Sequence, residues 1–266
     1  MKEFYFEERG ISYRMNDFRT DRPTLVFIHG LSGSSSAWLP YEELFESQYN
    51  LLTIDLRGHG MSDKPRRYDA YALKNFVDDV YKLLNHASVG KCIFVSHSFG
   101  TLIALEFIVA HQELVSRAIF LSPTAYLDNI RGSSLVRAGS IVLAALFRLI
   151  PFHPVIRGRV DYSRYHYTGD WDMRRIFSDI SRTTLRVYIY CLAHAYAVNY
   201  DELWKEIRVP TLIMHGTEDS YIPASHSVQL SKEIQHATLV LLPRANHIIV
   251  LNNIPEVSHH IETFVS

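Results

Sequence analysis

Strand-like and helix-like segments alternate along most of this chain, and that order limits the possible folds more than any other feature. Short apolar, β-rich runs that end in turn or polar residues occupy 24–30, 51–58, 92–96, 118–122, 211–216 and 238–243. Helical patterns, with apolar residues three and four positions apart, lie at 72–87 and 101–114. Strands this uniformly apolar need helices over both faces of their sheet. We therefore predict a doubly wound, mostly parallel α/β sheet.

Two segments depart from this alternation. Residues 4–15 are typical of a hairpin. Further on, the alternation stops for a long helix-prone stretch that is rich in aromatic residues and arginine. We predict a core built from residues 1–124 and 201–266, with a helical insertion, residues 125–200, at the carboxyl edge of the sheet.

Composition narrows the class of partner. The 266 residues carry a formal net charge of -1 and no run of like charges, so nothing indicates nucleic acid binding. With 47% hydrophobic residues, the chain can bury a full core. We expect a small-molecule substrate as the partner, and a homodimer stays open.

Cysteine content and the N-terminus favour a reducing compartment. Cys92 and Cys191 are too few for a disulfide framework, and the first ten residues lack the apolar core of a signal peptide. The most apolar segment, residues 138–147, is well short of the ~20 residues that span a membrane. We predict a cytoplasmic protein without stable membrane insertion, in which this segment forms a buried or interfacial helix.

One strand pattern, 92–96, runs almost directly into a helix pattern through the sequence Ser-His-Ser-Phe-Gly. A nucleophile at the tip of such a sharp turn needs small residues two positions before and after it, because the strand and helix backbones pass close together. Ser96 and Gly100 meet this need around Ser98, with Ser96 in place of the usual glycine. The free N–H groups at the helix start favour negative charge beside Ser98. Ser98 is therefore a candidate nucleophile.

Five separate motifs together resemble the α/β-hydrolase superfamily. They are FIHGLSGSSSAW (27–38), DLRGHGMSDKP (55–65), SHSFG (96–100), HGTEDSYIP (215–223) and PRANHIIVL (243–251). The resemblance covers nearly the whole chain outside the insertion. It implies an α/β-hydrolase fold and a serine esterase-like or lipase-like enzyme with a nucleophile elbow, a catalytic triad and an oxyanion hole.

The resemblance also implies a triad of Ser98, Asp219 and His247, in the chain order that this fold uses. His247 would act as the base that activates Ser98. Asp219 would orient His247 and stabilise its imidazolium form. Glu218 is the competing carboxylate, and the Gly-x-x-Asp spacing from Gly216 favours Asp219.

The same resemblance implies an oxyanion hole made by the backbone N–H groups of Leu31 and Phe99, beside a substrate loop that contains His29 and Gly30. We expect no cofactor, because the glycine-rich part of this loop lacks both common phosphate-binding patterns. We expect no metal either, because no group of histidine, cysteine and aspartate residues has ligand spacing. His59 is predicted to be a structural turn residue.

The insertion resembles the cap, or lid, that covers the active site in this family. Its apolar stretch at 141–147 and its aromatic residues suit a substrate with an acyl chain or a ring. The aromatic residues include Trp171, Tyr188, Tyr190 and Tyr196. We therefore predict a serine hydrolase that cleaves carboxylic esters with small or medium-chain, largely apolar acyl groups through an acyl-enzyme.

Two alternatives stay open. The first is a carbon–carbon bond hydrolase that acts on a keto acid with the same triad, in which Arg174 or Arg175 would hold the carboxylate of the substrate. The second is a member of the fold that binds a ligand without turning it over, because a fold does not imply a function. The complete triad argues against this second alternative.

Overall fold

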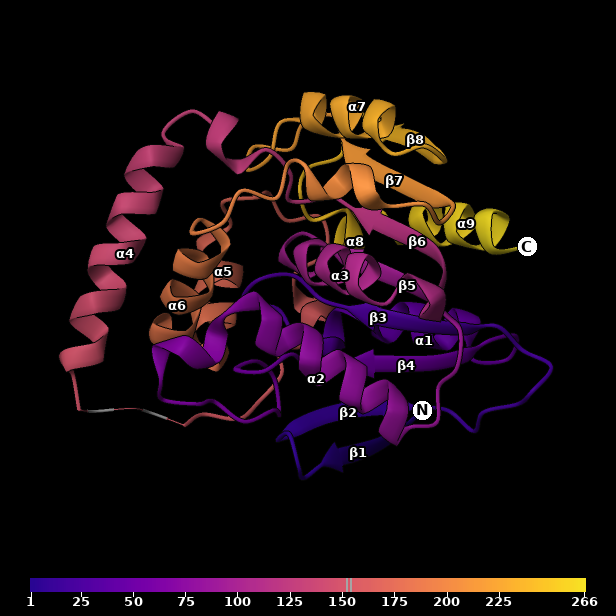
Figure 1. The fold of residues 1–266 in the computed structure, drawn as a ribbon, viewed down its shortest axis with the longest axis horizontal. Helices are drawn as coiled ribbons and strands as arrows, with labels where there is room; N and C mark the ends of the chain where they lie inside the picture. Colours follow the sequence, from indigo (N-terminus) through magenta and orange to yellow (C-terminus); the bar gives the residue numbers. More distant parts are fainter. Residues whose placement is uncertain (152, 154) are drawn as a thin grey trace.

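The structure, a computed structural model, describes residues 1–151, 153 and 155–266. Within these residues, eight strands form one sheet in the order β1-β2-β4-β3-β5-β6-β7-β8 (Figure 1). The strands are β1 Lys2–Phe6, β2 Ile11–Met15, β3 Thr24–Ile28, β4 Asn50–Ile54, β5 Cys92–His97, β6 Val115–Leu121, β7 Thr211–Gly216 and β8 Ala237–Leu242. β2 pairs with β1 and β4 in antiparallel fashion, and all the other neighbours are parallel. The predicted hairpin and the mostly parallel sheet are confirmed.

Helices connect the strands and form the insertion. The α-helices are α1 Leu39–Phe45, α2 Leu73–His86, α3 Phe99–Ala110, α4 Ser133–Leu149, α5 Met173–Thr183, α6 Leu185–Ala195, α7 Ala224–Glu233, α8 Ile249–Asn252 and α9 Ile254–Val265. The short 3-10 helices are η1 Ser35–Trp38, η2 Tyr68–Tyr71, η3 Gln112–Leu114, η4 Leu127–Asn129, η5 Tyr162–Arg164 and η6 Leu203–Glu206.

Both faces of the sheet are covered, as the apolar strands require. Successive residues of β3 point to opposite faces. Val26 and Ile28 pack in the cluster that contains α2, α3 and α7, whereas Leu25 and Phe27 pack in the cluster that contains α1, α8 and α9. Figure 1 shows α2 and α3 in front of the sheet and α1 and α9 behind it. A strand buried on both sides has no polar face, which explains the continuous apolar runs.

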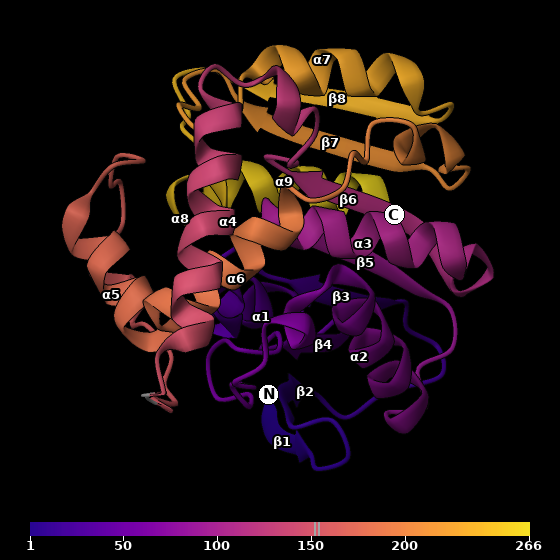
Figure 2. The same ribbon diagram turned by 60° about the vertical axis from the view of Figure 1, so that its left-hand side comes forward.

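The helices α4, α5 and α6 lie between β6 and β7 in the chain, within the predicted insertion 125–200. Residues 152 and 154 of that range lie outside the described residues. The three helices stand together at one side of the sheet, with α4 on the outside and packed against α6 (Figures 1 and 2). These helices leave the sheet continuous and form a helical layer beside the carboxyl ends of the parallel strands (Figures 1 and 2).

The apolar stretch 138–147 forms most of α4 but is not a buried helix. Only Ser140 and Ala144 within it are buried, and Ile141 and Val142 are 48% and 58% exposed. Leu143 and Leu146 are exposed as well, and only Phe147 among the large apolar side chains is half-buried and packs against the core. Of the two predicted alternatives, burial is wrong for most of this stretch, and an interfacial helix stays a prediction. No helix among the described residues is long and apolar enough to cross a membrane.

Candidate active site

The serine at the turn after β5 has a strained backbone. Ser98 has φ 49° and ψ -121°, a conformation that residues other than glycine rarely adopt, and α3 begins at the next residue. A Cβ on Gly100 would lie 2.6 Å from the carbonyl oxygen of His29, just after the neighbouring strand β3. Ser96 is fully buried and pairs with Ile28 of the same strand. Small residues are needed here because the turn is pressed against the end of β3.

A continuous chain of hydrogen bonds joins three of the predicted side chains. Asp219 lies in the loop after β7, and His247 lies in the loop after β8. Ser98 Oγ lies 2.8 Å from His247 Nε2, and His247 Nδ1 lies 2.6 Å from Asp219 Oδ2. An ionised carboxylate can only accept, so the proton belongs on Nδ1. Nε2 is then free to accept the proton of the serine hydroxyl.

The Asp219 side chain is fully buried and accepts three hydrogen bonds, with a second histidine ring close by. Its Oδ2 accepts from His247, and its Oδ1 accepts from the N–H groups of Tyr221 and Ile222 at 2.8 Å each. Nε2 of His215 lies 2.9 Å from Oδ2 and 3.0 Å from the backbone oxygen of Ile222, to which it donates. Burial by itself raises the pKa of a carboxyl group, but the two histidines hold the pKa of Asp219 well below its usual value. Asp219 therefore stays ionised and keeps its role as an acceptor.

The position of Asp219 follows from the close contact between its loop and the loop of His247. A Cβ on Gly216 would overlap the carbonyl oxygens of Ala245 and Asn246, so only glycine lets the two loops approach. Three residues after this glycine, Asp219 points inward. Glu218 is exposed to solvent.

His97, directly before Ser98, supports the histidine loop. Its Nε2 lies 3.1 Å from the backbone oxygen of His247. Burial, and to a lesser extent the neighbouring His247 ring, lowers the pKa of His97 to about 3. A neutral ring that donates from Nε2 to this carbonyl holds His247 in place without competing for the serine proton.

The loop after β3 lies beside Ser98, as predicted. A Cβ on Gly30 would lie 3.2 Å from Ser98 Cβ, and Leu31 and Phe99 both line the cavity described below. Within the part of the chain that the structure describes, the backbone N–H groups of Leu31 and Phe99 have no hydrogen-bond acceptor. Two unpaired donors close to the serine are what an oxyanion hole requires.

The rings of His29 and His59 are buried and bind backbone atoms. His29 donates from Nδ1 to the oxygen of Gly30 at 2.8 Å and accepts at Nε2 from the N–H of Leu56 at 3.0 Å. His59 accepts at Nε2 from the N–H of Ser32 at 3.3 Å. Both rings therefore hold the loops around the site together through hydrogen bonds. In the described ranges, no three histidine, cysteine or acidic residues are grouped so that they could hold a metal ion.

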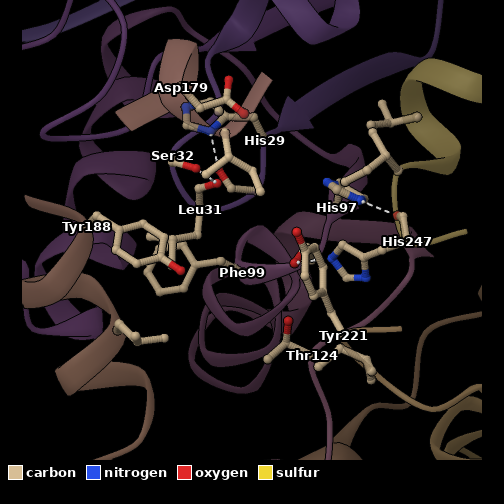
Figure 3. Close-up of a pocket in the computed structure, with 18 of the residues that line it drawn as sticks. His29, Leu31, Ser32, His97, Phe99, Thr124, Asp179, Tyr188, Tyr221 and His247 are labelled. Carbon is tan, nitrogen blue, oxygen red and sulfur yellow. Dashed lines mark hydrogen bonds between the residues drawn. The ribbon is translucent and has the colours of Figure 1, made fainter. Parts of the chain in front are cut away.

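Ser98 and His247 face a cavity of about 490 Å³ with mostly apolar walls. Figure 3 shows His247 and Tyr221 on one side of it and Tyr188 on the other. The insertion contributes Leu127, Ile130, Arg131, Val136, Tyr162, Trp171, Arg175, Ile176, Asp179, Ile180, Tyr188, Leu192, Ala195 and Tyr196. The apolar stretch 141–147 is not among the described residues that line this cavity, because its larger side chains point outward from α4. The expectation that it lines the cavity is therefore wrong.

The two candidate arginines have different environments. The Arg174 side chain is 82% exposed and pairs with Asp172 at 2.9 Å. Arg175 is buried and lines the cavity, where its Nη1 lies 3.4 Å from Asp179 Oδ2. Its Nε has no hydrogen-bond partner among the described residues. Burial raises the pKa of Asp179 to about 6, although Arg175 and a hydrogen bond from Tyr162 favour its ionised form.

Comparison with known families decides the identity of the fold. The family model described as the alpha/beta hydrolase fold matches residues 23–254. The chain belongs to this family. The match spans the loops of Ser98, Asp219 and His247, and it includes the insertion.

Individual relatives of this alpha/beta hydrolase carry different activities in their names. A (E)-2-((N-methylformamido)methylene)succinate hydrolase from Acinetobacter baylyi is 24% identical over 236 residues, which cover 85% of this chain and 84% of that protein. A putative esterase/lipase from Haemophilus influenzae is 28% identical over 233 residues, which cover 85% of this chain and 77% of that protein. Among solved structures, an alpha/beta hydrolase enzyme from a Medee basin deep-sea metagenome library has a TM-score of 0.76 at 22% identity, covering 99% and 97% of the two chains.

Three residues of this alpha/beta hydrolase site were not predicted, and one of them is His97, which adjoins Ser98 in the chain and binds the backbone of His247. His215 stands inside the motif that supplies Asp219, four positions before it, but its closeness to the carboxylate depends on how the loop folds back on β7. Asp170 lies in the insertion and accepts a hydrogen bond from the backbone N–H of His247. No sequence pattern marks Asp170.

Proposed function

We propose that this chain is a serine hydrolase that cleaves carboxylic esters with largely apolar acyl groups through an acyl-enzyme. The observation that carries the proposal is the hydrogen-bonded chain from Ser98 through His247 to Asp219 at a strained turn, open to an apolar cavity. The relatives named as hydrolases support hydrolysis as the class of reaction, and the putative esterase/lipase supports esters.

The proposed reaction begins when His247 Nε2 takes the proton of the Ser98 hydroxyl and Oγ attacks the ester carbonyl carbon. The N–H groups of Leu31 and Phe99 then stabilise the negative charge on the carbonyl oxygen. As the carbon–oxygen bond breaks, the leaving alcohol takes the proton from His247. Water attacks the acyl-enzyme by the same route and releases the carboxylic acid. Asp219 stabilises the imidazolium in each half of the cycle.

The composition of the cavity supports an apolar acyl group. We propose that residues 125–200 act as a cap, because α5 and α6 supply much of the wall opposite Ser98. Ile176, Ile180, Tyr188 and Leu192 give that wall an apolar surface. Burying each methylene of an acyl chain against such a surface contributes up to ~0.8 kcal/mol, or about fourfold in kcat/KM.

A second candidate is hydrolysis of a carbon–carbon bond in a keto acid by the same residues. Arg175 favours it, because a buried guanidinium with an unpaired Nε can bind a carboxylate. The relative named for a succinate derivative points the same way. Asp179 already compensates much of this charge, however, and most of the wall is apolar. We therefore rank this candidate second.

Covalent labelling tests the proposed nucleophile. A fluorophosphonate is expected to add once to the native protein and not to Ser98→Ala, whose activity should fall by on the order of 10⁶ because the three residues act as a unit. Labelling of the variant at the native rate would contradict the assignment. No labelling and no turnover in the native protein would favour a ligand-binding role.

Substrate profiles separate the two candidate reactions. For an esterase, kcat/KM should rise from p-nitrophenyl acetate to medium-chain esters, and Arg175→Ala should change it little. Arg174→Ala serves as the matched control, since that side chain is exposed. Uniformly slow ester cleavage, together with fast cleavage of a vinylogous keto acid that is lost only in Arg175→Ala, would establish the second candidate instead.

A further inference from the structure

A short segment of the insertion is fastened to the loop that carries His247. We call residues 168–172 the clasp segment. The backbone oxygen of Thr168 accepts hydrogen bonds from the side-chain amides of Asn246 at 2.8 Å and Asn252 at 2.9 Å. Two amide donors on one carbonyl oxygen fix the start of the clasp segment against the residues on either side of His247.

Asp170, in the middle of the clasp segment, joins the acid loop to the histidine loop. It is 5% exposed. Its Oδ1 accepts from the backbone N–H of His247 at 2.9 Å, and its Oδ2 accepts from the N–H and the hydroxyl of Ser220 at 2.9 and 2.8 Å. Ser220 directly follows Asp219. One buried carboxylate from the insertion thus binds the backbone of the base itself and that of the residue next to the acid.

We propose that Asp170 is a positioning residue that sets the distance between Asp219 and His247. This inference rests on the proposed function, in which those two side chains act together with Ser98. The two oxygens of a carboxylate are held rigidly by the same carbon, so binding one loop with each oxygen fixes the separation of the loops. Hydrogen bonds to an ionised acceptor are also shorter and stronger than those between neutral groups.

The contact is needed because the acid and the base lie on separate loops after adjacent strands, β7 and β8. Their bond of 2.6 Å tolerates little change in the separation of these loops. Displacement of a catalytic group by about 1 Å can lower the rate by about 10²-fold. The insertion is held to the core elsewhere too, by Arg159 Nε on Asp55 at 2.8 Å. Loss of Asp170 would therefore loosen the two loops without releasing the insertion.

Substitution of Asp170 tests the inference, and Asp172 provides a matched control. Asp172 lies in the same segment, but its carboxylate caps α5 by accepting from the N–H groups of Arg174 and Arg175. Asp170→Ala should lower kcat, and the rate of fluorophosphonate labelling, by about 10- to 100-fold with KM within about threefold. The kcat of Asp170→Asn should lie between those of Asp170→Ala and the native protein, because the amide oxygen of asparagine can still accept from the N–H of His247. Asp172→Ala should keep the native kcat within about threefold.

A readout without turnover distinguishes failure of this inference from failure of the proposed function. The far-downfield proton resonance of His247 Nδ1–H should be seen in the native protein and in Asp172→Ala, and should be lost or exchange faster in Asp170→Ala. An unchanged resonance and kcat in Asp170→Ala would overturn the inference, as would equal losses in the two alanine variants. Absence of labelling and turnover in the native protein would refute the proposed function, and the resonance alone would then decide the role of Asp170.

Discussion

The substitution Asp219→Asn is the sharpest test of the hydrogen-bond chain, because it removes charge and changes almost no volume. Three donors bind this carboxylate, two backbone N–H groups at Oδ1 and His247 at Oδ2, and Nε2 of His215 lies 2.9 Å from Oδ2. An asparagine offers one acceptor oxygen and one NH₂ group. If the oxygen stays with the backbone donors, the NH₂ group meets His247 Nδ1, which must itself become an acceptor.

The consequence for catalysis follows from the tautomer of His247. With an NH₂ group opposite, Nδ1 must accept a hydrogen bond, so the ring proton moves to Nε2. Nε2 can then no longer accept the proton of the Ser98 hydroxyl. The loss expected for the wrong tautomer is about 10⁴-fold in kcat, which corresponds to about 5 kcal/mol of transition-state stabilisation. The lost hydrogen bonds to a charged acceptor should also lower the free energy of unfolding by about 1.5–3 kcal/mol.

The assay measures kcat and KM on a p-nitrophenyl ester, the rate of fluorophosphonate labelling, and the urea midpoint of each variant. Glu218→Gln is the matched control, because it removes the neighbouring carboxylate from an exposed position. Its kcat should stay within about threefold of the native value, since it breaks no contact within the site. Activity of Asp219→Asn within tenfold of native, or a larger loss in Glu218→Gln, would refute the reasoning.

Two further substitutions test the packing around the site. Gly100→Ala should lower the free energy of unfolding by about 1–3 kcal/mol, because its Cβ meets the backbone oxygens of Ile28 in β3 and of His29. Gly139→Ala, where the new Cβ points into open space on α4, should raise the free energy of unfolding by about 0.5–1 kcal/mol. Urea unfolding measures both variants, and equal effects would contradict the close packing at Gly100. Burial raises the pKa of Asp179 to about 6, so the protonated group stabilises the fold below pH 4 and this contribution is lost as the pH rises through 6. The free energy of unfolding in urea of the native protein, relative to Asp179→Asn, should therefore fall by about 2 kcal/mol between pH 4 and pH 8. A rise over this range would contradict the burial of Asp179.

The sheet and the sharp turn at Ser98 were predictable because their signals are local, whereas Asp219 and His247 were chosen through the family resemblance. A buried strand must be apolar along its length, and a sharp turn must have small residues at fixed distances from the serine. The need for a small residue at position 100 could be deduced from the turn. The segment packed against it could not, because the sequence near residue 100 does not reveal that the end of β3 lies there.

Side-chain direction in the insertion could not be predicted, because it depends on which helix packs against which. The apolar content of α4 suggested burial, yet its buried residues are the small ones Ser133, Ser140 and Ala144, and most of its large apolar side chains are exposed. Asp170 and Asp172 pose the same problem more sharply. Both are aspartates in one segment, two positions apart. In the structure, Asp170 binds the backbone of His247 and Asp172 caps the start of α5, a difference that the sequence does not indicate.

The parts of the site therefore depend on different parts of the molecule. The strained backbone of Ser98 is held by the core, since its N–H donates to Leu121 of β6 at 3.0 Å and its carbonyl accepts from both the N–H and the hydroxyl of Thr101 at 2.8 and 2.6 Å. The acid and the base lie in loops that meet through Gly216 and through the insertion at Asp170. Changes in the insertion should consequently alter turnover while the nucleophile turn and the sheet stay intact. Changes at the turn should affect stability and turnover together.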